Sequence, residues 1–463
     1  MSESFDVVVI GAGPAGENVA GRCAEGGLTV AIVESELVGG ECSYWGCMPS
    51  KALLRPGDVL AAARRVPGAA GSVTGGADPL ATFATRDSFA GHWDDQGQVP
   101  WLVERGIELV RGTGRLAGES AVVVAQRDGT TRHLVATTAV VIATGTRAAR
   151  PPIAGLAEAG PWDNRDITAT SKVPGRLLVI GGGVIGCEMA QAFRRLGTSE
   201  VTIVEAMDRL LGAEEPFVGE ELRQAFTAEG IRVITGARVA RVERRPDGSV
   251  VAELGDPGEV TADEVLVATG RRPATENLGL ELFGIEPGGP IAVDDRLRAT
   301  AVPGGWLYAV GDCNGRSLLT HMGKYQARVC GEVILGRDVT DLADGLAVPR
   351  VTFTDPQVSA VGLTEAQARQ SGRRVRAVSF PTGHVAGSAV LGEGAVGTSK
   401  IVVDEDTHVI VGATFTGTNV QELLHSATVA IVGQVPIERL WHAVPSFPTV
   451  SEVWLRLMEA YER

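Results

Sequence analysis

The chain has 463 residues, of which 44% are hydrophobic and 21% charged, and this composition is typical of a globular protein with more than one core. Its 56 acidic residues outnumber 42 basic ones, and a formal net charge of -14 argues against nucleic acid or an anionic membrane as a partner. No apolar run reaches the roughly 18 residues of a membrane span. A strand pattern begins at once, with no charged leader and cleavage site before it. We expect about two or three domains and a cytoplasmic protein.

The first predicted element is a buried strand over residues 5–10, which leads into the glycine-rich sequence Gly11-Ala12-Gly13-Pro14-Ala15-Gly16. A helical pattern follows, and a second strand then ends at Glu34. In this order of elements the first glycine permits a tight turn, the second lets the backbone approach a pyrophosphate, and the third lets the helix pack on the strand. The helix N-terminus stabilises phosphate groups, and the terminal acid can bind a ribose hydroxyl. These residues predict a dinucleotide site.

A pair of cysteines follows within Gly40-Glu41-Cys42-Ser43-Tyr44-Trp45-Gly46-Cys47-Met48-Pro49-Ser50-Lys51. Beside a dinucleotide site, this pair indicates electron transfer between a nucleotide cofactor and a disulfide. Five residues of regular helix rise about 7.5 Å and rotate about 500°, which is beyond the roughly 7 Å Cα separation that a disulfide tolerates. We therefore expect a distorted helix start, with Gly46 and Pro49 supplying flexibility and a break. The alternative is two buried thiols that pack as small apolar groups.

Turns and short strands separate this region from a second glycine-rich unit. Residues 66–79, rich in Gly, Ala and Pro, are expected to form a surface excursion, and Asp-Gly sequences within 127–130 and 246–249 predict hairpin turns. Two apolar runs, 139–145 and 264–270, both close on Ala-Thr-Gly and predict buried strands that end at Gly145 and Gly270.

The second glycine-rich unit repeats the first. A strand over residues 176–180 leads into Gly181-Gly182-Gly183-Val184-Ile185-Gly186, and the strand after the next helix ends near Glu205. One such motif is a weak signal, because glycine clusters also occur in plain turns. Two copies, each with a strand before, a helix after and an acid at the expected distance, predict two bound dinucleotides.

A third region begins near residue 349 and alternates strand patterns (400–403 and 409–415) with helical ones (364–370 and 420–432), so it is not a third nucleotide fold. The remaining cysteines are scattered, form no secreted disulfide framework and contain no C-x2-C pair typical of zinc. We expect no metal site. These cysteines are Cys23, Cys187, Cys313 and Cys330.

Together these features resemble the flavin-dependent pyridine nucleotide–disulfide oxidoreductases, the group that contains dihydrolipoamide dehydrogenase, glutathione reductase and mercuric reductase. The resemblance covers nearly the whole chain, and its motifs come in the family's order. They are the two glycine-rich turns, the cysteine pair with Met48-Pro49-Ser50-Lys51, the Ala-Thr-Gly strands, Tyr308-Ala309-Val310-Gly311-Asp312 and Pro448-Thr449-Val450-Ser451-Glu452.

The resemblance implies an α/β fold with two Rossmann-like domains and an α+β dimerisation domain. The FAD-binding domain would span residues 1–147 and 271–344, the NAD(P)-binding domain 148–270 and the dimerisation domain 345–463, in a homodimer whose active site straddles both subunits. The residues implied to bind FAD are Gly11, Gly13, Pro14, Ala15, Gly16, Glu34, Gly40, Lys51, Thr144, Gly145, Gly311 and Asp312. Those implied to bind NAD are Gly181, Gly183, Ile185, Gly186, Glu205 and Gly270.

The resemblance also implies a mechanism. NADH would deliver a hydride to flavin N5, and the flavin would pass electrons to the Cys42–Cys47 disulfide. Cys47 would face the flavin as the charge-transfer thiolate, and Cys42 would be the outer thiol that meets the substrate. Lys51 would pair with Glu188 near flavin N5 and the nicotinamide, whereas without the family Lys51 would be interpreted as a solvated helix charge. Glu205 favours NADH, because its carboxylate would repel a 2′-phosphate, and NADPH is the alternative coenzyme.

The chain departs from the disulfide-reducing members at the C-terminal motif, where Phe447 replaces the histidine that acts as acid–base catalyst from the partner subunit, while Glu452, which would orient it, is kept. Losing such a base costs typically about 10²–10⁴-fold in rate, so disulfide exchange should be impaired. His442 lies nearby but is off register. The alternative for Phe447 is that it fills core space.

The acceptor therefore stays open among small-molecule disulfides, soft metals and quinones. A dihydrolipoamide-dehydrogenase-like exchange is closest by overall pattern, yet weakened by Phe447. A mercuric-reductase-like transfer fits Phe447, but no cysteine follows Cys330; a carboxylating relative with Phe here replaces the glutamate that this chain keeps. Diaphorase-like quinone reduction needs no proton relay. A rival from another class is a non-catalytic flavin redox sensor.

Two further departures lie close to the predicted flavin. Tyr44 and Trp45 stand where relatives usually carry Asn and a small aliphatic residue, and they would either wall the flavin and narrow the substrate path or pack against the helix. Residues 320–325 replace a small, apolar helix start, whose backbone N–H groups would still stabilise charge at flavin O2. His321 is interpreted as a structural histidine.

Overall fold

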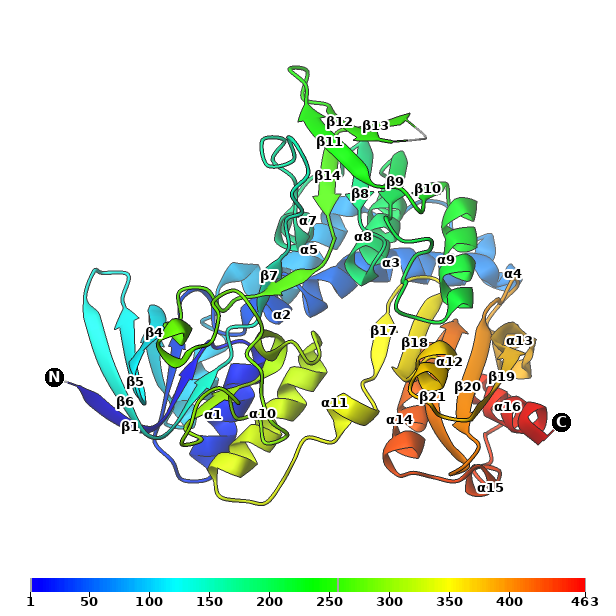
Figure 1. The fold of residues 1–463 in the computed structure, drawn as a ribbon. Coiled ribbons are helices and arrows are strands. Elements are labelled where there is room, and N and C mark those ends of the chain that lie inside the picture. The colour runs from blue at the N-terminus through cyan, green and yellow to red at the C-terminus, as the bar shows by residue number, and fades with distance from the viewer. Residues whose placement is uncertain (1, 256–257, 463) are drawn as a thin grey trace. The chain divides into compact units, whose positions relative to one another are not determined.

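The computed structural model describes residues 2–255 and 258–462 and has the mixed α/β architecture that the sequence predicts (Figure 1). The chain forms two compact units, each assembled from separate stretches of sequence. The first unit consists of Met1–Pro49, Asp87–Ala149 and Arg271–Asp344, and the second of Ser50–Arg86, Arg150–Gly270 and Gly345–Arg463.

A seven-stranded sheet forms the centre of the first unit, with the order β3-β2-β1-β6-β5-β4 and with β16 paired to β6. Strands β1, β2, β3, β6 and β16 pair in parallel, while β4 and β5 form antiparallel pairs at one edge. The strands are β1 (Glu3–Ile10), β2 (Val30–Glu34), β3 (Glu108–Arg111), β4 (Thr113–Gly118), β5 (Ala121–Ala125), β6 (Thr131–Ile142) and β16 (Leu307–Ala309), with β7 (Thr146–Ala148) and β15 (Arg271–Pro273) as a separate antiparallel pair.

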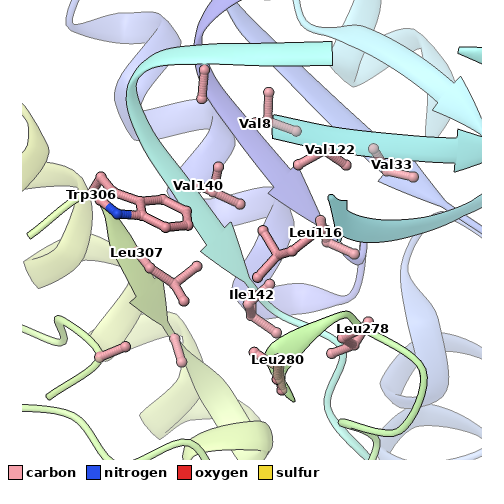
Figure 2. Packing of buried hydrophobic residues seen from close by; sticks show 14 of the residues in the cluster. Val8, Val33, Leu116, Val122, Val140, Ile142, Leu278, Leu280, Trp306 and Leu307 are labelled. Atoms are coloured by element: carbon pink, nitrogen blue, oxygen red, sulfur yellow. The ribbon is translucent and has the colours of Figure 1, made fainter. Parts of the chain in front are cut away.

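Parallel strands that are covered on both faces have continuous apolar sequences, because the side chains on both faces are buried, and β1 is an example. Val8 and Ile10 point into one core, which also contains Leu116, Val140 and Trp306 (Figure 2). Val7 and Val9 point into the opposite core, where helices α1 and α10 cover the sheet. The helices of this unit are α1 (Pro14–Glu25), α2 (Gly40–Tyr44), α6 (Val99–Glu104), α10 (Thr320–Ile334) and the short η1 (Gly91–Trp93), η2 (Leu280–Phe283) and η3 (Gly311–Asn314).

The second unit contains three sheets. A parallel sheet has the order β10-β9-β8-β14, an antiparallel one β11-β12-β13, and a five-stranded antiparallel one β17-β18-β21-β20-β19. The strands are β8 (Arg176–Ile180), β9 (Glu200–Val204), β10 (Ile231–Ile234), β11 (Val239–Arg244), β12 (Val250–Leu254), β13 (Gly258–Ala262), β14 (Glu264–Val267), β17 (Arg350–Thr352), β18 (Gln357–Gly362), β19 (Val375–Pro381), β20 (Thr398–Asp404) and β21 (Val409–Gly417).

The second unit also contains most of the helices. They are α3 (Cys47–Arg65, whose first residues belong to the first unit), α4 (Pro67–Ala70), α5 (Pro79–Phe89), α7 (Asn164–Ala169), α8 (Val184–Arg195), α9 (Pro216–Ala228), α11 (Ala343–Leu346), α12 (Glu365–Gln370), α13 (Ala386–Val390), α14 (Leu424–Val432), α15 (Ile437–Leu440), α16 (Val453–Glu462) and the short η4 (Thr382–His384), η5 (Val420–Glu422) and η6 (Val450–Glu452). α5 and α11 likewise cross a boundary between the units.

Both predicted hairpin turns are confirmed. Asp128 accepts a hydrogen bond from the Thr130 N–H at 2.9 Å between β5 and β6, and Asp247 accepts one from the Ser249 N–H at 3.0 Å between β11 and β12. The predicted excursion at 66–79 contains α4, and its last residue, Pro79, begins α5. Within the described residues, every helix is too short or too polar to span a bilayer.

Candidate redox and nucleotide sites

The first glycine-rich turn leaves no room for side chains at its two ends. Gly11 has φ +106°, and a Cβ there would lie 2.5 Å from the Ala143 carbonyl oxygen. A Cβ on Gly16 would lie 1.9 Å from the Gly11 carbonyl oxygen. Helix α1 begins at Pro14, so its first N–H groups point out of this turn, where the predicted pyrophosphate would sit.

The second turn repeats this geometry in the second unit. Gly181 has φ +110°, and its Cβ would lie 2.4 Å from the Ala268 carbonyl oxygen. A Cβ on Gly186 would lie 2.0 Å from the Gly181 carbonyl oxygen, whereas one on Gly183 would meet nothing within 4 Å. Helix α8 begins at Val184, so the two predicted nucleotide turns share one construction.

Each turn is held by the carboxylate at the end of the second strand. Glu34 accepts hydrogen bonds from the Ala12 N–H at 2.8 Å and the Glu36 N–H at 2.7 Å. Burial raises the pKa of Glu34. Glu205 accepts hydrogen bonds in the same way from the Gly182 and Met207 N–H groups, both at 2.6 Å. The acids that the motif predicts as ribose ligands therefore also brace the turns themselves.

A chain of hydrogen bonds in the first unit leads to Asp312, the predicted ligand of the ribityl chain. The Thr146 hydroxyl donates to Asp312 at 2.7 Å, Arg271 Nε donates to Thr146 Oγ1 at 2.7 Å, and Arg271 Nη2 pairs with Glu41 at 2.6 Å. Burial raises the pKa of Asp312. Arg271 and Glu41 were not predicted, because the motif marks only the ligand and not the residues that hold it.

The residues around the first turn fit FAD. Thr144 Oγ1 is buried and has no hydrogen-bond partner within the described residues, so it is available to a ligand. Gly145 and Gly311 both have positive φ beside it, and Gly40 approaches Gly13 so closely that a Cβ on Gly40 would lie 2.8 Å from the Gly13 Cα. Ala15 and Gly311 also lie close, since a Cβ on Gly311 would be 3.1 Å from the Ala15 Cβ.

The helix is broken between the two cysteines. α2 ends at Tyr44, α3 begins at Cys47, and Trp45 adopts φ -138° and ψ 1° between them. The predicted distortion is therefore confirmed at Trp45 and Gly46. The predicted break at Pro49 is wrong, because Pro49 lies inside the first turn of α3, where the missing N–H has no helical acceptor.

The break brings both sulfur atoms to one hydroxyl group. Both cysteines are thiols in this structure. Cys47 Sγ lies 3.2 Å from Thr320 Oγ1, at the first residue of α10, and Cys42 is hydrogen-bonded to Cys47 and Thr320. The hydrogen bond with Cys47, together with burial, raises the pKa of the Cys42 thiol, whereas Thr320 and Lys324 oppose that shift. The sequence predicted a helix start at residue 320 but not the role of its side chain.

Lys51 and Glu188 form an ion pair in the second unit. Lys51 Nζ lies 2.7 Å from Glu188 Oε2, and the Glu188 side chain is only 3% exposed. The Phe353 N–H donates to the other carboxylate oxygen at 2.9 Å. The structure thus brings together two residues 137 positions apart that the resemblance paired.

The C-terminal motif has no acid–base partner at residue 447. The Phe447 side chain is 75% exposed, so the interpretation that it fills the core of this chain is wrong. Glu452 is buried and bound within its own region: Oε1 accepts from Arg456 at 2.7 Å, and Oε2 accepts from the Ala386 N–H at 3.3 Å. His442 is exposed. The glutamate that would orient a histidine is therefore engaged by Arg456.

The aromatic residues between the cysteines pack together. Tyr44 is buried, its hydroxyl donates to the Val38 carbonyl at 2.9 Å, and its ring centroid lies 5.7 Å from that of Trp45. This supports the packing alternative for Tyr44. His321 is exposed in the first turn of α10.

The other cysteines are packing residues. All four are fully buried, and burial raises the pKa of Cys23 and of Cys313 to about 12, so neither is a nucleophile near neutral pH. Within residues 2–255 and 258–462 no group of three or more His, Cys, Asp and Glu side chains could hold a metal ion.

Family models match almost the whole chain. Residues 5–327 match the model described as pyridine nucleotide-disulphide oxidoreductase, and residues 348–458 match the dimerisation domain of the same group.

Individual relatives agree with these matches. The chain is 35% identical to a dihydrolipoyl dehydrogenase of Thermus scotoductus, over 99% of this chain and 97% of that protein. It is 31% identical to a mercuric reductase of Staphylococcus aureus, over 97% of this chain and 81% of that protein. Among solved structures, a Cu(II) complex of the HOCl-induced flavoprotein disulfide reductase RclA from Escherichia coli has a TM-score of 0.86 at 25% identity, with 99% of each chain covered.

Replacing the third glycine of each turn with alanine should show which turn binds which cofactor. Gly16→Ala should purify with little bound FAD, because its Cβ would overlap the Gly11 carbonyl. Gly186→Ala should keep FAD but raise the KM for NADH about tenfold or more, since overpacking costs about 1–3 kcal/mol. Flavin absorbance and NADH titration measure these outcomes. Gly68→Ala, which meets nothing within 4 Å, is the control; equal FAD loss in both turn variants would contradict the assignment.

FAD affinity should fall with rising pH because of Glu17, in the first turn of α1. Burial raises the pKa of Glu17 to about 7, an effect that Lys324 opposes and Glu34 increases. Between pH 6 and 8.5 Glu17 gains a negative charge beside the predicted pyrophosphate, so the Kd of the apoprotein for FAD should rise about 3- to 10-fold. Glu17→Gln should abolish this dependence in a flavin-fluorescence titration, and an unchanged pH profile in Glu17→Gln would refute it.

Proposed function

Because this chain belongs to the pyridine nucleotide–disulphide oxidoreductase family, we propose that it is an NADH-dependent enzyme that reduces a thiophilic metal ion through the Cys42–Cys47 pair. The family establishes an NAD(P)H-dependent flavoprotein disulfide oxidoreductase that uses FAD and NAD(H). The metal acceptor and the residue roles are our proposal. When bound, FAD supplies a two-electron carrier between the nicotinamide and the disulfide.

We assign FAD binding to residues 1–147 and 271–344, NAD binding to 148–270, and the contact between two copies to 345–463. The match to the family's dimerisation domain supports a homodimer. We place the enzyme in the cytoplasm and expect neither nucleic acid nor membrane as a partner, in keeping with its net charge of -14.

NADH is the proposed electron donor. The Glu205 carboxylate, braced by two backbone N–H groups, would repel a 2′-phosphate. Arg209, the nearest cation in the sequence, is committed to Asp208 at 3.1 Å and to the Gly212 carbonyl at 2.9 Å. The Nη groups of Arg209 are therefore already engaged within the protein.

The observation that supports our choice of acceptor is that Phe447 stands where the resemblance places a histidine base. Exchange with a disulfide substrate requires a base that takes the proton of the outer thiol. Phe447 cannot do so, and Arg456 occupies Glu452. A coordinated soft metal ion deprotonates a thiol outright, so it needs no base.

In the proposed step the two thiols lose two protons and two electrons and form the Cys42–Cys47 bond. The electrons reduce one Hg(II) to Hg(0) or two Cu(II) ions to Cu(I). The helix N-terminus of α10 and the Thr320 hydroxyl stabilise the thiolate form of Cys47. The similarity to a mercuric reductase and to a flavoprotein solved as its Cu(II) complex supports this acceptor class.

The acceptor is tested by anaerobic NADH oxidation with lipoamide, a naphthoquinone, Cu(II) or Hg(II). Native protein should turn over the metal ions at least about tenfold faster than lipoamide, within the range expected for a missing base. Cys42→Ser and Cys47→Ser should abolish metal reduction. If quinone is the best acceptor and Cys42→Ser retains it, the flavin donates directly and the metal proposal fails. If lipoamide is the best acceptor, the dihydrolipoyl dehydrogenase assignment stands. If NADH oxidation shows no multiple turnover with any acceptor, the non-catalytic redox sensor is favoured.

Restoring the relay should require two substitutions. Phe447→His alone should gain little lipoamide turnover, because Glu452 stays bound to Arg456. Phe447→His with Arg456→Leu releases Glu452 to orient the new imidazole, and lipoamide turnover should rise about 10-fold or more. Arg456→Leu alone is the matched control. A double variant no better than the control would show that the relay is not what limits disulfide exchange.

Coenzyme choice is tested by kcat/KM for NADH and NADPH. Native protein should prefer NADH, and Glu205→Gln, which removes the charge but keeps one acceptor, should raise kcat/KM for NADPH about tenfold. A native kcat/KM higher for NADPH than for NADH would overturn the assignment.

A further inference from the structure

Three elements of the second unit meet around the Lys51–Glu188 pair. They are helix α3, helix α8 and residues 353–355, which lie in the connection between β17 and β18 and which we call the strap. Each of the three sends side chains or backbone groups to the other two, and all of these contacts lie inside the second unit.

Helix α8 presents one face to the strap. Glu188, Gln191 and Arg195 are spaced i, i+3 and i+7, so they lie on the same side of the helix. Glu188 accepts from the Phe353 N–H at 2.9 Å. Gln191 makes two bonds to the backbone of Asp355, accepting from its N–H at 2.8 Å and donating to its carbonyl at 2.9 Å. The strap therefore runs along α8 in a fixed register.

Helix α3 closes the cluster from the other side at seven-residue intervals. Lys51 pairs with Glu188 at 2.7 Å, Asp58 with Arg195 at 2.9 Å, and Arg65 with Asp355 at 2.7 Å. Arg195 also contacts Asp355 at 2.8 Å. A displacement of the strap would consequently break contacts to both helices.

The strap is anchored at Asp355 by a cluster of ion pairs that is largely shielded from water. The Arg195 side chain is 12% exposed and also pairs with Glu229 at 2.6 Å. Burial acts to raise the pKa of Asp355, but Arg195 and Arg65 outweigh it and hold that pKa below its usual range. Asp355 therefore remains charged near neutral pH, and Gln191 and Arg195 keep the strap in place.

Phe353 is the strap residue that contacts both members of the Lys51–Glu188 pair. Its N–H holds the Glu188 oxygen that Lys51 does not use, and its ring lies 4.6 Å from Lys51 Nζ. An ammonium group at this distance from a ring is attracted to its face. The backbone N–H of Phe353 thus orients the Glu188 carboxylate, and the Phe353 ring orients the Lys51 ammonium group.

We propose that Phe353 is a positioning residue for the Lys51–Glu188 pair and that the strap delivers it. This inference rests on the proposed role of that pair in hydride transfer from NADH to oxidised flavin, which leaves NAD⁺ and adds two electrons to the flavin. In this role Phe353 acts through Lys51 and Glu188. It limits the orientations open to Lys51, whose side chain is 33% exposed.

The test measures flavin bleaching by NADH in anaerobic stopped flow, with no acceptor present, so a failed metal proposal cannot affect it. Phe353→Leu, which keeps the backbone N–H and removes the ring, should slow bleaching about 3- to 10-fold. Phe353→Tyr, which keeps the ring, should stay within about twofold of native. Deuterated NADH should show a larger isotope effect with Phe353→Leu than with native protein, because hydride transfer becomes rate-limiting.

A second variant tests the anchor. Asp355→Asn keeps the backbone bonds to Gln191 but loses the charge that Arg195 and Arg65 hold, and it should raise the isotope effect in the same direction. Native bleaching with Phe353→Leu, or slower bleaching with an unchanged isotope effect, would overturn the inference. Lys51→Met separates the two levels: native-like bleaching there refutes the role of the ion pair itself, whereas slow bleaching there with native Phe353→Leu refutes only the part played by Phe353.

Discussion

The break in the helix between Tyr44 and Cys47 is the constraint on which the chemistry of this protein depends. A continuous helix would carry the two sulfur atoms apart. Because α3 restarts at Cys47, both thiols reach the Thr320 hydroxyl at the N-terminus of α10. The same restart sets the phase of α3, which determines where Lys51, Asp58 and Arg65 fall along the helix.

The two glycine-rich turns share one local geometry, and in our proposal each binds one of the two cofactors. In both, a glycine with positive φ, a second glycine packed on the first and a carboxylate that accepts two N–H groups make a rigid cradle. Their surroundings differ. The first turn lies beside the buried Thr144 hydroxyl and the Asp312 chain, which suits the larger flavin cofactor, whereas in the second Gly183 stays open.

The C-terminal motif keeps its glutamate but carries no titratable side chain at position 447. Glu452 is present where the family places it, yet its carboxylate is bound to Arg456 and to the Ala386 N–H, and Phe447 extends into solvent in the single chain. A glutamate can orient a histidine only where a histidine is present. Here the same carboxylate pairs with Arg456 of α16 and accepts from the Ala386 N–H at the start of α13.

The sequence by itself determined the family, the α/β fold, the two cofactors and the cysteine pair, because glycine turns, terminal acids and a C-x4-C spacing are local constraints that a short stretch of chain must satisfy alone. It also located the distortion at Gly46. Tertiary structure alone decided which side chains complete these sites. Four residues contact partners that lie far away in the sequence: Thr320, Arg271, Phe353 and Asp355. Pro49 lies inside α3 and does not break it. Pairings of this kind depend on the phase of helices that meet in space, which no local pattern encodes.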